Sequence, residues 1–445
     1  MILIIAGLVL LVTWPLYNLT LVWTSARAGT ADRRRQHHDA GRTIGHEPRE
    51  FWIVIPCLNE ERVIGRTVAA ALALPTPPGT RRFVLVVDDA SDDGTPAVLA
   101  AIRHPELQIL RREAPDAKRG KGEALNAAYH FIRTCATLYG TPPRQVAIGV
   151  IDGDGRGSPN ILSEVRVAMR DLRVGAVQCR VRIHNRDRVL GAVQDLEFGC
   201  IANASQVLRN RLGTVGLGGN GQFTRLSALL ELGPTPWSSC LVEDLELGLR
   251  LRLARERIRY VSAATVAQQG VVDVRRLLRQ RTRWAQGNLQ CVRYVPRLIA
   301  SRDIGNAALI EMLYYLLAPW LNAAGTGTVG ALWGYAIWRL LPGHGAPFLL
   351  TSWAELAAVV VIWAAAMLAP PVTWAGVHRL QLRDERIIPL LGAAVVYPGF
   401  LMLGLASTVR AIARQATGRN AWAKTERLAE APTLAPPPAQ PVPQT

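Results

Sequence analysis

Apolar residues are spread unevenly along this chain of 445 residues, and their spacing divides it into regions. Long apolar runs lie at the N-terminus and after about residue 306, whereas residues 51–150 hold short runs separated by polar turns. A run of about 20 apolar residues can cross a bilayer, and a run of about four to eight indicates a buried strand. The pattern predicts a soluble α/β domain between membrane segments.

The long runs predict an N-terminal transmembrane helix over residues 1–24 and a C-terminal membrane region over residues 306–410. The second region would hold about three to four helices, some of them interfacial. Its apolar stretches are 307–340, 353–377 and 387–409.

Polar segments separate these regions. Residues 25–50 form a basic linker, and the arginines that follow the first span place the N-terminus outside and the soluble domain in the cytoplasm. Ala26-Arg27-Ala28 also resembles a cleavage site, which leaves signal-peptide removal as the alternative. Residues 411–445 form a cytoplasmic tail whose end, rich in Pro and Ala, we expect to be disordered.

The last apolar stretch raises a conflict. Arginines flank it on both sides, and the positive-inside rule assigns both flanks to the cytoplasm, which one crossing cannot satisfy. A hairpin would resolve the conflict, as would a segment lying partly in the interface and bent at Pro389 and Pro398. The flanking residues are Arg379, Arg383, Arg386, Arg410, Arg414 and Arg419.

Strands and helices alternate in the soluble region. Strands are predicted at 51–56, 83–87, 107–110 and from residue 146, with helices between them. Such alternation indicates a parallel sheet, in which ligands bind beyond the carboxyl ends of the strands. Acidic clusters follow the second and fourth strands, so the sequence predicts a ligand site at this edge.

Asp152 and Asp154, separated by Gly153, follow the fourth strand. Carboxylates are hard oxygen ligands that suit Mg²⁺ or Mn²⁺ carrying a diphosphate. An isolated Asp-x-Asp is equally typical of a solvated turn. The interpretation therefore depends on the other motifs of the chain.

The composition is strongly basic, with 51 Lys and Arg against 34 Asp and Glu and a net charge of +17. Nucleic-acid binding is one explanation, but the arginines cluster beside apolar spans, which favours a cytoplasmic domain at anionic lipid. We therefore expect a lipid bilayer as partner and no nucleic acid. The six cysteines form no Cys-x-x-Cys and indicate reduced thiols.

Several motifs in a fixed order then resemble the membrane-embedded family 2 glycosyltransferases, which include cellulose, chitin and hyaluronan synthases. The resemblance covers about residues 50–300, and Trp422 to Arg427 is similar to the family's cytoplasmic end. It implies an α/β GT-A domain over residues 51–300 that binds a nucleotide-sugar. The motifs are Pro56 with Asn59-Glu60, Asp88-Asp89, Lys121, Asp152-Gly153-Asp154, Glu243-Asp244 and Gln280-x-x-Arg283-Trp284.

The resemblance implies a donor site on these residues. Asp88 and Asp89 would bind the nucleoside, with Leu58 and Glu60 in the same pocket, and Lys121 would balance the charge of the diphosphate. An Asx cap on the following helix is the alternative for the two acids.

The resemblance also assigns the metal. Asp152, which contributes to the nucleotide-sugar site as well, and Asp154 would hold Mg²⁺ or Mn²⁺, with Asp154 the direct ligand. The metal would neutralise the charge that develops on the departing diphosphate.

Asp244 matches the family's catalytic base and Glu243 accompanies it in the diphosphate and acceptor site. An inverting transfer needs one carboxylate within reach of the acceptor hydroxyl. The alternative is an acidic first turn of a helix, favoured by the helix dipole. Val242 departs from the family pattern, which has Thr or a similar residue there.

Gln280, Arg283 and Trp284 share one face of a predicted basic helix over residues 274–297. Arg283 could clamp the diphosphate, Trp284 could stack on an acceptor sugar and Gln280 could bond to the site. An interfacial helix with a Trp anchor is the alternative. Gly219-Asn220-Gly221 could line the acceptor site or form a plain turn.

Taken together, these features predict a multi-pass plasma-membrane enzyme, a metal-dependent inverting glycosyltransferase with a cytoplasmic catalytic domain. It would transfer a sugar, from UDP by preference, to a growing polysaccharide. A non-processive transfer to a membrane lipid or polyprenyl phosphate is the first alternative, and a catalytically silent membrane scaffold is the second.

Overall fold

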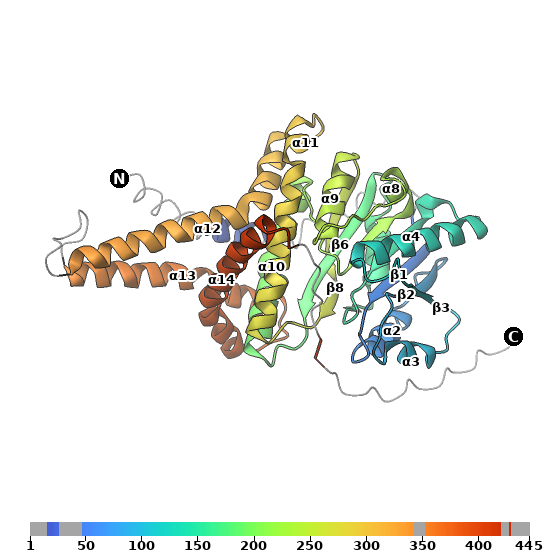
Figure 1. Cartoon of the computed structure of the whole chain (residues 1–445), viewed down its shortest axis with the longest axis horizontal. Coiled ribbons are helices and arrows are strands. Elements are labelled where there is room, and N and C mark those ends of the chain that lie inside the picture. Colours follow the sequence, from blue (N-terminus) through green and yellow to red (C-terminus); the bar gives the residue numbers. More distant parts are fainter. Residues whose placement is uncertain (1–15, 26–46, 342–351, 420–426, 429–445) are drawn as a thin grey trace.

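The computed structural model describes residues 16–25, 47–341, 352–419 and 427–428. Its soluble part is built on one eight-stranded sheet in the order β3-β2-β1-β4-β7-β6-β8-β5 (Figure 1). Four parallel strands, β1 to β4, form one half, and the remaining strands form a mixed half that joins β4 through the antiparallel β7. The α/β class and the parallel half agree with the sequence prediction.

The parallel half follows the predicted strands closely. It comprises β1 (Glu50–Cys57), β2 (Arg81–Asp88), β3 (Leu107–Arg111) and β4 (Val146–Val150). In the register, Cys57 pairs with Asp88, and Asp88 pairs with Arg111. The carboxyl ends of these strands, and the polar side chains after them, therefore meet at one edge of the sheet.

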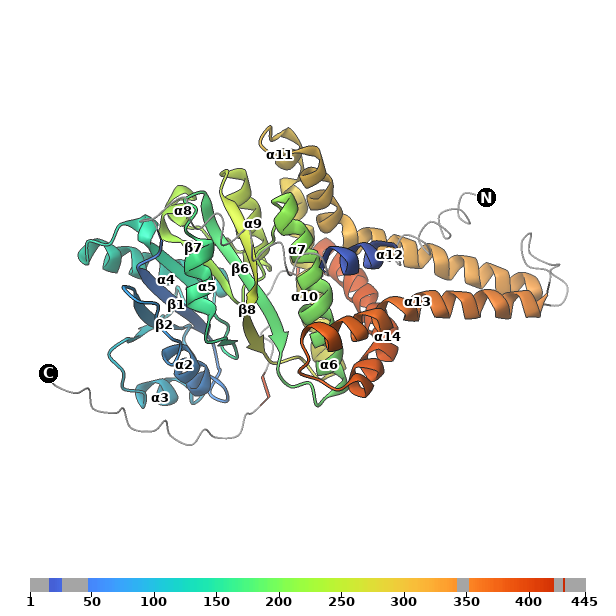
Figure 2. The same cartoon turned by 180° about the vertical axis from the view of Figure 1, so that it is seen from behind.

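Alternating side chains of β1 supply two cores, one on each face of the sheet. Trp52 and Val54 pack with α4 (Lys121–Leu138) and α8 (Leu226–Glu231). Ile53 and Ile55 pack on the other face, so both sides of the strand are buried, as in covered parallel sheets. The helices on that face are α2 (Ile64–Leu72), α3 (Thr95–Ala100) and α5 (Ile161–Ala168) (Figure 2).

The strands of the mixed half were harder to predict from the sequence. Strand β6 (Val174–Ile183) has the alternating pattern of a strand in its sequence, whereas β5 (Arg156–Gly157), β7 (Gln222–Arg225) and β8 (Arg257–Gln268) were not predicted. Helix α9 (Glu243–Leu253) begins at the predicted acidic turn. The single helix expected over residues 274–297 is divided into α10 (Val274–Cys291), a 3₁₀ turn (Val292–Tyr294) and α11 (Val295–Ala300), where Pro296 takes the first turn of the new helix.

A helical segment beside the sheet changes its hydrogen bonding midway. It begins as α6 (Val189–Asp195), continues as a π-helix over Leu196–Ala202, and ends as α7 (Asn203–Leu212) before Gly213, whose φ of 73° closes the helix. This segment packs with α10 against the long apolar helices of the C-terminal region.

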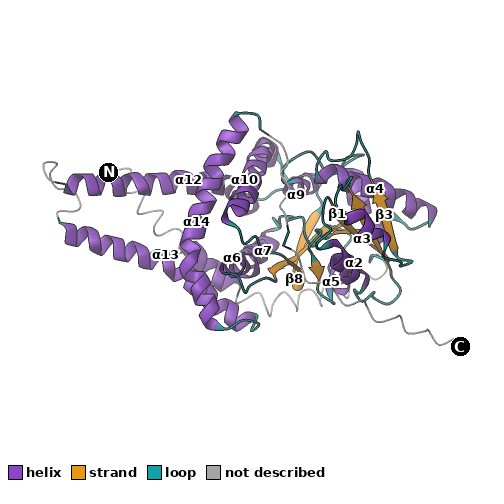
Figure 3. Ribbon diagram, turned by 60° about the horizontal axis from the view of Figure 1, so that its bottom comes forward, coloured by secondary structure: helices purple, strands orange, loops and turns teal. Residues whose placement is uncertain are grey.

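Three helices are long and apolar enough to cross a membrane among the residues described, α12 (Asn306–Leu340), α13 (Trp353–Gln381) and α14 (Ile387–Ala416). Helices α12 and α13 project from the domain as a pair, whereas α14 runs beside α10 at the foot of that pair (Figures 1 and 3). Residues 16–25 are helical and pack on α13, where Asn18 accepts a 2.7 Å hydrogen bond from Trp374. The rest of the predicted 1–24 span and most of the linker and tail lie outside the described residues.

Candidate active site

The acids after β2 are matched by arginines at the end of β3. Asp88 is 2.6 Å from Arg111 and also accepts a 3.0 Å hydrogen bond from the main-chain N–H of Ser91. Asp89 is 2.5 Å from Arg112, and both of these side chains are about nine-tenths buried. The hydrogen bond from Ser91 is the local Asx-type contact that the sequence offered as the alternative to nucleoside binding. It uses one carboxylate oxygen of Asp88, and the other oxygen pairs with Arg111.

The loop after β1 lies between the two acidic clusters. Leu58 and Glu60 are half-buried there. The main-chain N–H of Glu60 donates a 2.8 Å hydrogen bond to the hydroxyl of Thr95. A Cβ placed on Gly153 would lie 3.1 Å from Cγ of Glu60. The Glu60 side chain therefore rests against the Asp152–Asp154 turn.

Small residues and side-chain contacts hold the Asp152–Asp154 turn. The hydroxyl of Thr67 donates a 2.7 Å hydrogen bond to the carbonyl of Gly153, and Asn220 accepts one of 3.2 Å from the main-chain N–H of Asp152. A Cβ on Gly155 would lie 2.6 Å from Ile151, so a larger residue would force the turn open. Asn220 is thus a structural support of the turn.

Asp154 is fully buried and is held from two sides. One carboxylate oxygen accepts a 2.8 Å hydrogen bond from the main-chain N–H of Gln269, and the other lies 2.9 Å from the guanidinium of Arg427. The side chain of Gln269 in turn bonds to both main-chain groups of Leu428, at 2.9 and 3.0 Å. Two residues of the C-terminal tail therefore reach the turn that the sequence assigned to a metal.

Lys121 joins this turn to the start of α9. Its ammonium lies 2.6 Å from Asp152 and 3.6 Å from Glu243, and a Cβ on Gly219 would lie 3.3 Å from it. Burial lowers the pKa of Lys121, but the carboxylates of Asp152, Glu243 and Asp244 outweigh that effect and raise the pKa. Lys121 is consequently a permanent positive charge at the centre of the site.

Asp244 faces the same point. A Cβ on Gly219 would lie 2.9 Å from its Oδ2, while its Oδ1 accepts a 2.8 Å hydrogen bond from the N–H of Leu245. Burial and the adjacent Glu243 carboxylate raise the pKa of Asp244 to about 7, against the opposing charge of Lys121. A carboxylate with such a pKa can exchange a proton with a hydroxyl near neutral pH.

The residues predicted on α10 take different positions. Arg283 is half-buried, and it lies close enough to Glu243, Asp152 and Asp244 for their charges to support its own, although desolvation lowers its pKa. Gln280 is buried. The Trp284 ring, by contrast, has the Arg281 guanidinium 4.7 Å from its centroid and Phe198 at 6.2 Å in an edge-on arrangement.

The carboxylates of Asp152 and Asp154 fit a divalent cation that takes its remaining ligands from the phosphates of a substrate. No group of three metal-binding side chains is found in the described part of the chain. Two carboxylates are nevertheless sufficient for Mg²⁺ or Mn²⁺ when substrate phosphates complete the coordination. Burial raises the pKa of Asp154, whereas Lys121 outweighs burial and lowers the pKa of Asp152, and Arg427 shows that a positive charge is accommodated at Asp154.

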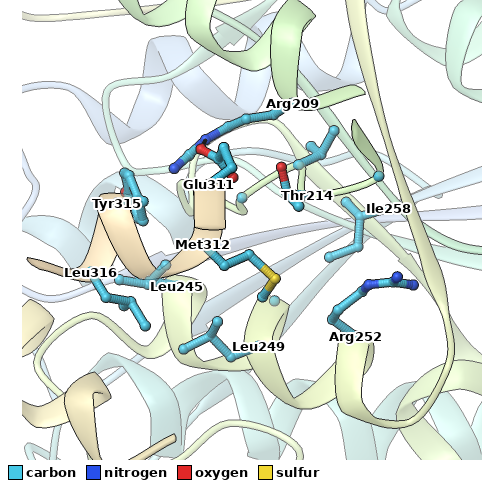
Figure 4. A pocket seen from close by; sticks show the side chains of 14 residues that line it. Arg209, Thr214, Leu245, Leu249, Arg252, Ile258, Glu311, Met312, Tyr315 and Leu316 are labelled. Carbon is cyan, nitrogen blue, oxygen red and sulfur yellow. Dashed lines mark hydrogen bonds and ion pairs between the residues drawn. The ribbon is translucent and has the colours of Figure 1, made fainter. Parts of the chain in front are cut away.

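A cavity of about 30 Å³ lies between α9 and the first turns of α12 (Figure 4). Arg209 crosses it to Glu311 at 2.6 Å and lies over the Tyr315 ring at 3.6 Å. The Thr214 hydroxyl and one Glu311 oxygen, both at this cavity, have no hydrogen-bond partner among the described residues. The volume suits an ordered water rather than a sugar or an acyl chain.

Four residues of the site were missed in the sequence. The sequence could have indicated Arg111 and Arg112, because they lie at the end of a strand that neighbours β2 in a parallel sheet. Arg281, which pairs with Glu197 at 2.5 Å, lies inside the Gln280-x-x-Arg283-Trp284 motif but is not one of its defining positions. Gln269 had no signal, because its position depends on β8, a strand that the apolar pattern did not predict.

Residues 48–287, more than half of the chain, match the family described as "Glycosyltransferase like family 2". The chain is 32% identical over 296 residues to the beta-monoglucosyldiacylglycerol synthase of Synechocystis sp., a match covering 63% of this chain and 57% of that relative. It is 28% identical over 247 residues to the poly-beta-1,6-N-acetyl-D-glucosamine synthase of Staphylococcus epidermidis, with 53% of each covered. The matches thus span little more than half of the relatives' lengths.

Among solved structures, a mannosyltransferase from Pyrobaculum calidifontis in complex with GDP-Man and Mn²⁺ is similar, with a TM-score of 0.53 and 20% identity. The likeness covers 85% of this chain and 98% of that one. At this identity it bears on the fold alone, and it confirms the predicted GT-A arrangement.

Proposed function

The chain belongs to the glycosyltransferase-like family 2, and we propose from this premise that it transfers a sugar from a nucleoside-diphosphate sugar to a hydroxyl of a membrane lipid, with inversion at the anomeric carbon. The observation that carries the proposal is the meeting of Lys121, Asp152 and Asp244 around Gly219. This arrangement combines a fixed cation, a carboxylate that would hold the metal and a carboxylate able to accept a proton. UDP is the donor nucleotide of this proposal, as the motifs predict.

In the transfer, Asp244 takes the proton of the acceptor hydroxyl. The acceptor oxygen bonds to the anomeric carbon, and the bond from that carbon to the diphosphate oxygen breaks with its electron pair on the leaving group. Lys121 and Arg283, both half-buried cations near Asp152, stabilise the charge that develops on the diphosphate. Glu243 helps to keep the pKa of Asp244 near 7, where a base works efficiently at neutral pH.

Asp152 and Asp154 would hold Mg²⁺ or Mn²⁺. When bound, the metal supplies Lewis-acid stabilisation of the departing diphosphate. Asp88, Asp89, Leu58 and Glu60 remain the proposed contacts of the nucleoside end. Asp88 and Asp89 would there share their charge with Arg111 and Arg112.

A lipid acceptor fits the surroundings of the base. Leu245, the residue after Asp244, packs in one apolar cluster with Met312 and Leu316 of α12. The residue next to the proposed base therefore packs on α12, a helix that belongs to the proposed membrane region. The relative from Synechocystis, whose name contains a glucosylated diacylglycerol, supports the same acceptor class.

A polysaccharide acceptor is the second candidate, favoured by the Gln280-x-x-Arg283-Trp284 motif and by the N-acetylglucosamine polymer in the name of the Staphylococcus relative. Stacking of an acceptor sugar on Trp284 would have to use ring surface left by Arg281 and Phe198. In both versions residues 51–300 form a cytoplasmic catalytic domain and residues 306–410 anchor it in the plasma membrane.

The proposal is tested by release of UDP from UDP-sugars by the protein in lipid nanodiscs with Mn²⁺. Diacylglycerol is present or absent, and the product is then sized. A single donor with a small lipid-soluble product supports the lipid acceptor, and a long product supports the polysaccharide. If UDP- and GDP-sugars with either acceptor give no turnover while the protein stays folded, the transferase proposal fails.

A further inference from the structure

Cys240 and Cys291 face each other where the loop before α9 meets the end of α10. Their sulfur atoms are 3.9 Å apart, and the two side chains are only 9% and 0% exposed. Neither thiol has a part in the proposed transfer. Cys240 nevertheless precedes Asp244 by four residues, and Cys291 ends the helix that carries Arg283. The pair therefore connects the element that holds the proposed base to the element that holds a cation of the donor site.

Further contacts fix the loop on α10. The main-chain N–H of Leu241 donates a 3.0 Å hydrogen bond to the side chain of Gln290, and the thiol of Cys240 donates one of 3.8 Å to the carbonyl of Gly287. A Cβ on Gly287 would lie 2.7 Å from Val242, so the two elements already touch there. The segment that leads to the proposed base therefore follows the position of the last turns of α10.

A buried carboxylate joins the same two elements a second time. Glu246 of α9 accepts hydrogen bonds from the hydroxyl groups of Ser238, in the loop, and of Tyr294, just after α10. It also pairs with Arg293. Because the junction is held at several points, the two thiols stay close together as long as the domain is folded.

The two thiols differ in their access to solvent. Cys240 lies in an irregular segment directly after the exposed Ser239, whereas Cys291 is enclosed in an apolar cluster to which α9 and α12 contribute. A hydrogen bond with Cys240 and burial raise the pKa of Cys291. Oxidation follows exposure and thiolate character, so a small oxidant meets Cys240 first, and Cys291 is placed to react with the oxidised sulfur.

We propose that Cys240 and Cys291 are a modification site, at which hydrogen peroxide forms a reversible disulfide that slows the transfer. The sulfur of Cys240 attacks one peroxide oxygen, the O–O bond breaks, and a sulfenic acid and one water result. The sulfur of Cys291 then bonds to the sulfur of Cys240, and the sulfenic oxygen leaves with the Cys291 proton as a second water. The two thiols lose two electrons in total, which reduce one hydrogen peroxide to two waters. A dithiol reductant reverses the reaction by thiol–disulfide exchange.

The bond changes the geometry of the junction. It shortens the distance between the sulfur atoms from 3.9 Å to about 2.0 Å. Since Val242 already lies against Gly287, the loop cannot move toward α10 as a whole, and closure turns the segment that leads to Asp244. A displacement of about 1 Å in an active site can cost about a hundredfold in rate. This consequence rests on the proposed function, whereas formation of the bond does not.

Peptide mapping tests the site on the full-length protein in lipid nanodiscs. The protein is treated with hydrogen peroxide until the half-buried Cys135 has reacted, and is then digested without reduction. Mass spectrometry should find Cys240 and Cys291 in one linked peptide pair, lighter by two hydrogen atoms than the separate peptides, and dithiothreitol should remove the link. Any other state of Cys240 once Cys135 has reacted, whether free thiol or sulfinic acid, would overturn the proposal.

Release of UDP by the same samples tests the consequence. Turnover should fall about 10- to 100-fold on oxidation and return with dithiothreitol. Cys240→Ser and Cys291→Ser should each keep their turnover in peroxide, whereas the control Cys135→Ser should respond like the parent protein. A complete link without loss of turnover would overturn the proposed effect on transfer. If the reduced protein turns over no donor, the proposed function fails, and the peptide map still decides whether the disulfide forms.

Discussion

Two acidic clusters at the same sheet edge differ in how their charges are balanced. At the end of β2, Asp88 and Asp89 each have an arginine from the adjacent strand, at 2.6 and 2.5 Å. Around the end of β4 and the start of α9, the acids depend on cations from distant parts of the chain, namely Lys121 and Arg427. Burial raises the pKa of Asp154 in this cluster, and the pKa of Asp244 is raised to about 7.

The difference shows what each cluster can do. A one-to-one set of ion pairs between neighbouring strands ties those strands together. A cluster with shared cations and a raised pKa can release a proton, bind a metal or pair with a diphosphate when these arrive. We therefore expect variants of the arginines in the first cluster to change stability, and variants in the second cluster to change catalysis.

The largest effect is expected for Asp244→Asn. Loss of a general base typically costs about 10² to 10⁴ in rate, so turnover should fall by roughly a thousandfold. UDP binding and the melting temperature should stay close to those of the parent protein. Asp187→Asn, a change at an exposed acid, is the matched control. Retained turnover in Asp244→Asn would remove this residue from the base role and break the comparison.

Arg112→Met should act on stability instead. Removal of one member of a buried ion pair leaves an uncompensated charge, which typically costs about 3 to 5 kcal/mol in the free energy of unfolding. Denaturant unfolding in detergent would measure this loss, and the double variant Asp89→Asn/Arg112→Met should recover part of it. An unchanged stability of Arg112→Met would show that this pair is not structural.

Arg427→Gln tests the role of the C-terminal arginine that pairs with Asp154. Since Arg427 lies 2.9 Å from Asp154, its removal should free that carboxylate and tighten Mn²⁺ binding about tenfold, equivalent to about 1.4 kcal/mol. Titration of Mn²⁺ followed by EPR measures the affinity without turnover, with Arg419→Gln as the control in the same segment. Weaker binding in Arg427→Gln would mean that the arginine supports the metal site rather than competing with it.

The smallest effect is a shift of the pH profile in Glu243→Gln. The Glu243 carboxylate raises the pKa of Asp244, so its neutralisation should lower that pKa. The acidic limb of log kcat/KM should then move to lower pH, by roughly one unit, and activity should persist further into the acid range. Glu231→Gln, at an exposed position, should leave the limb in place. An upward shift would contradict the assignment.

The sequence predicted the parallel half of the fold because β1, β2, β3 and β4 each contribute apolar residues at strand spacing. It also predicted that Asp88 and Asp152 lie at strand ends and Asp244 at a helix start, where the structure has them, while their roles stay predictions. The mixed half was harder to predict, because β7 has four residues and β5 only two. The approach of Arg427 to Asp154 could not be predicted, because it depends on tertiary contacts made by Gln269 and α14.

The π-helix at Leu196–Ala202 has a consequence for the length of this segment. A π-turn holds one more residue than an α-turn, so deletion of one residue would restore α-helical bonding and rotate α6 by about 100° relative to α7. Glu197 faces Arg281 near the start of the π-helix, and Asn203 bonds to Tyr260 just after its end. After a single-residue deletion, Glu197 and Asn203 could no longer contact Arg281 and Tyr260 at the same time. The number of residues in this segment is therefore constrained as well as their type.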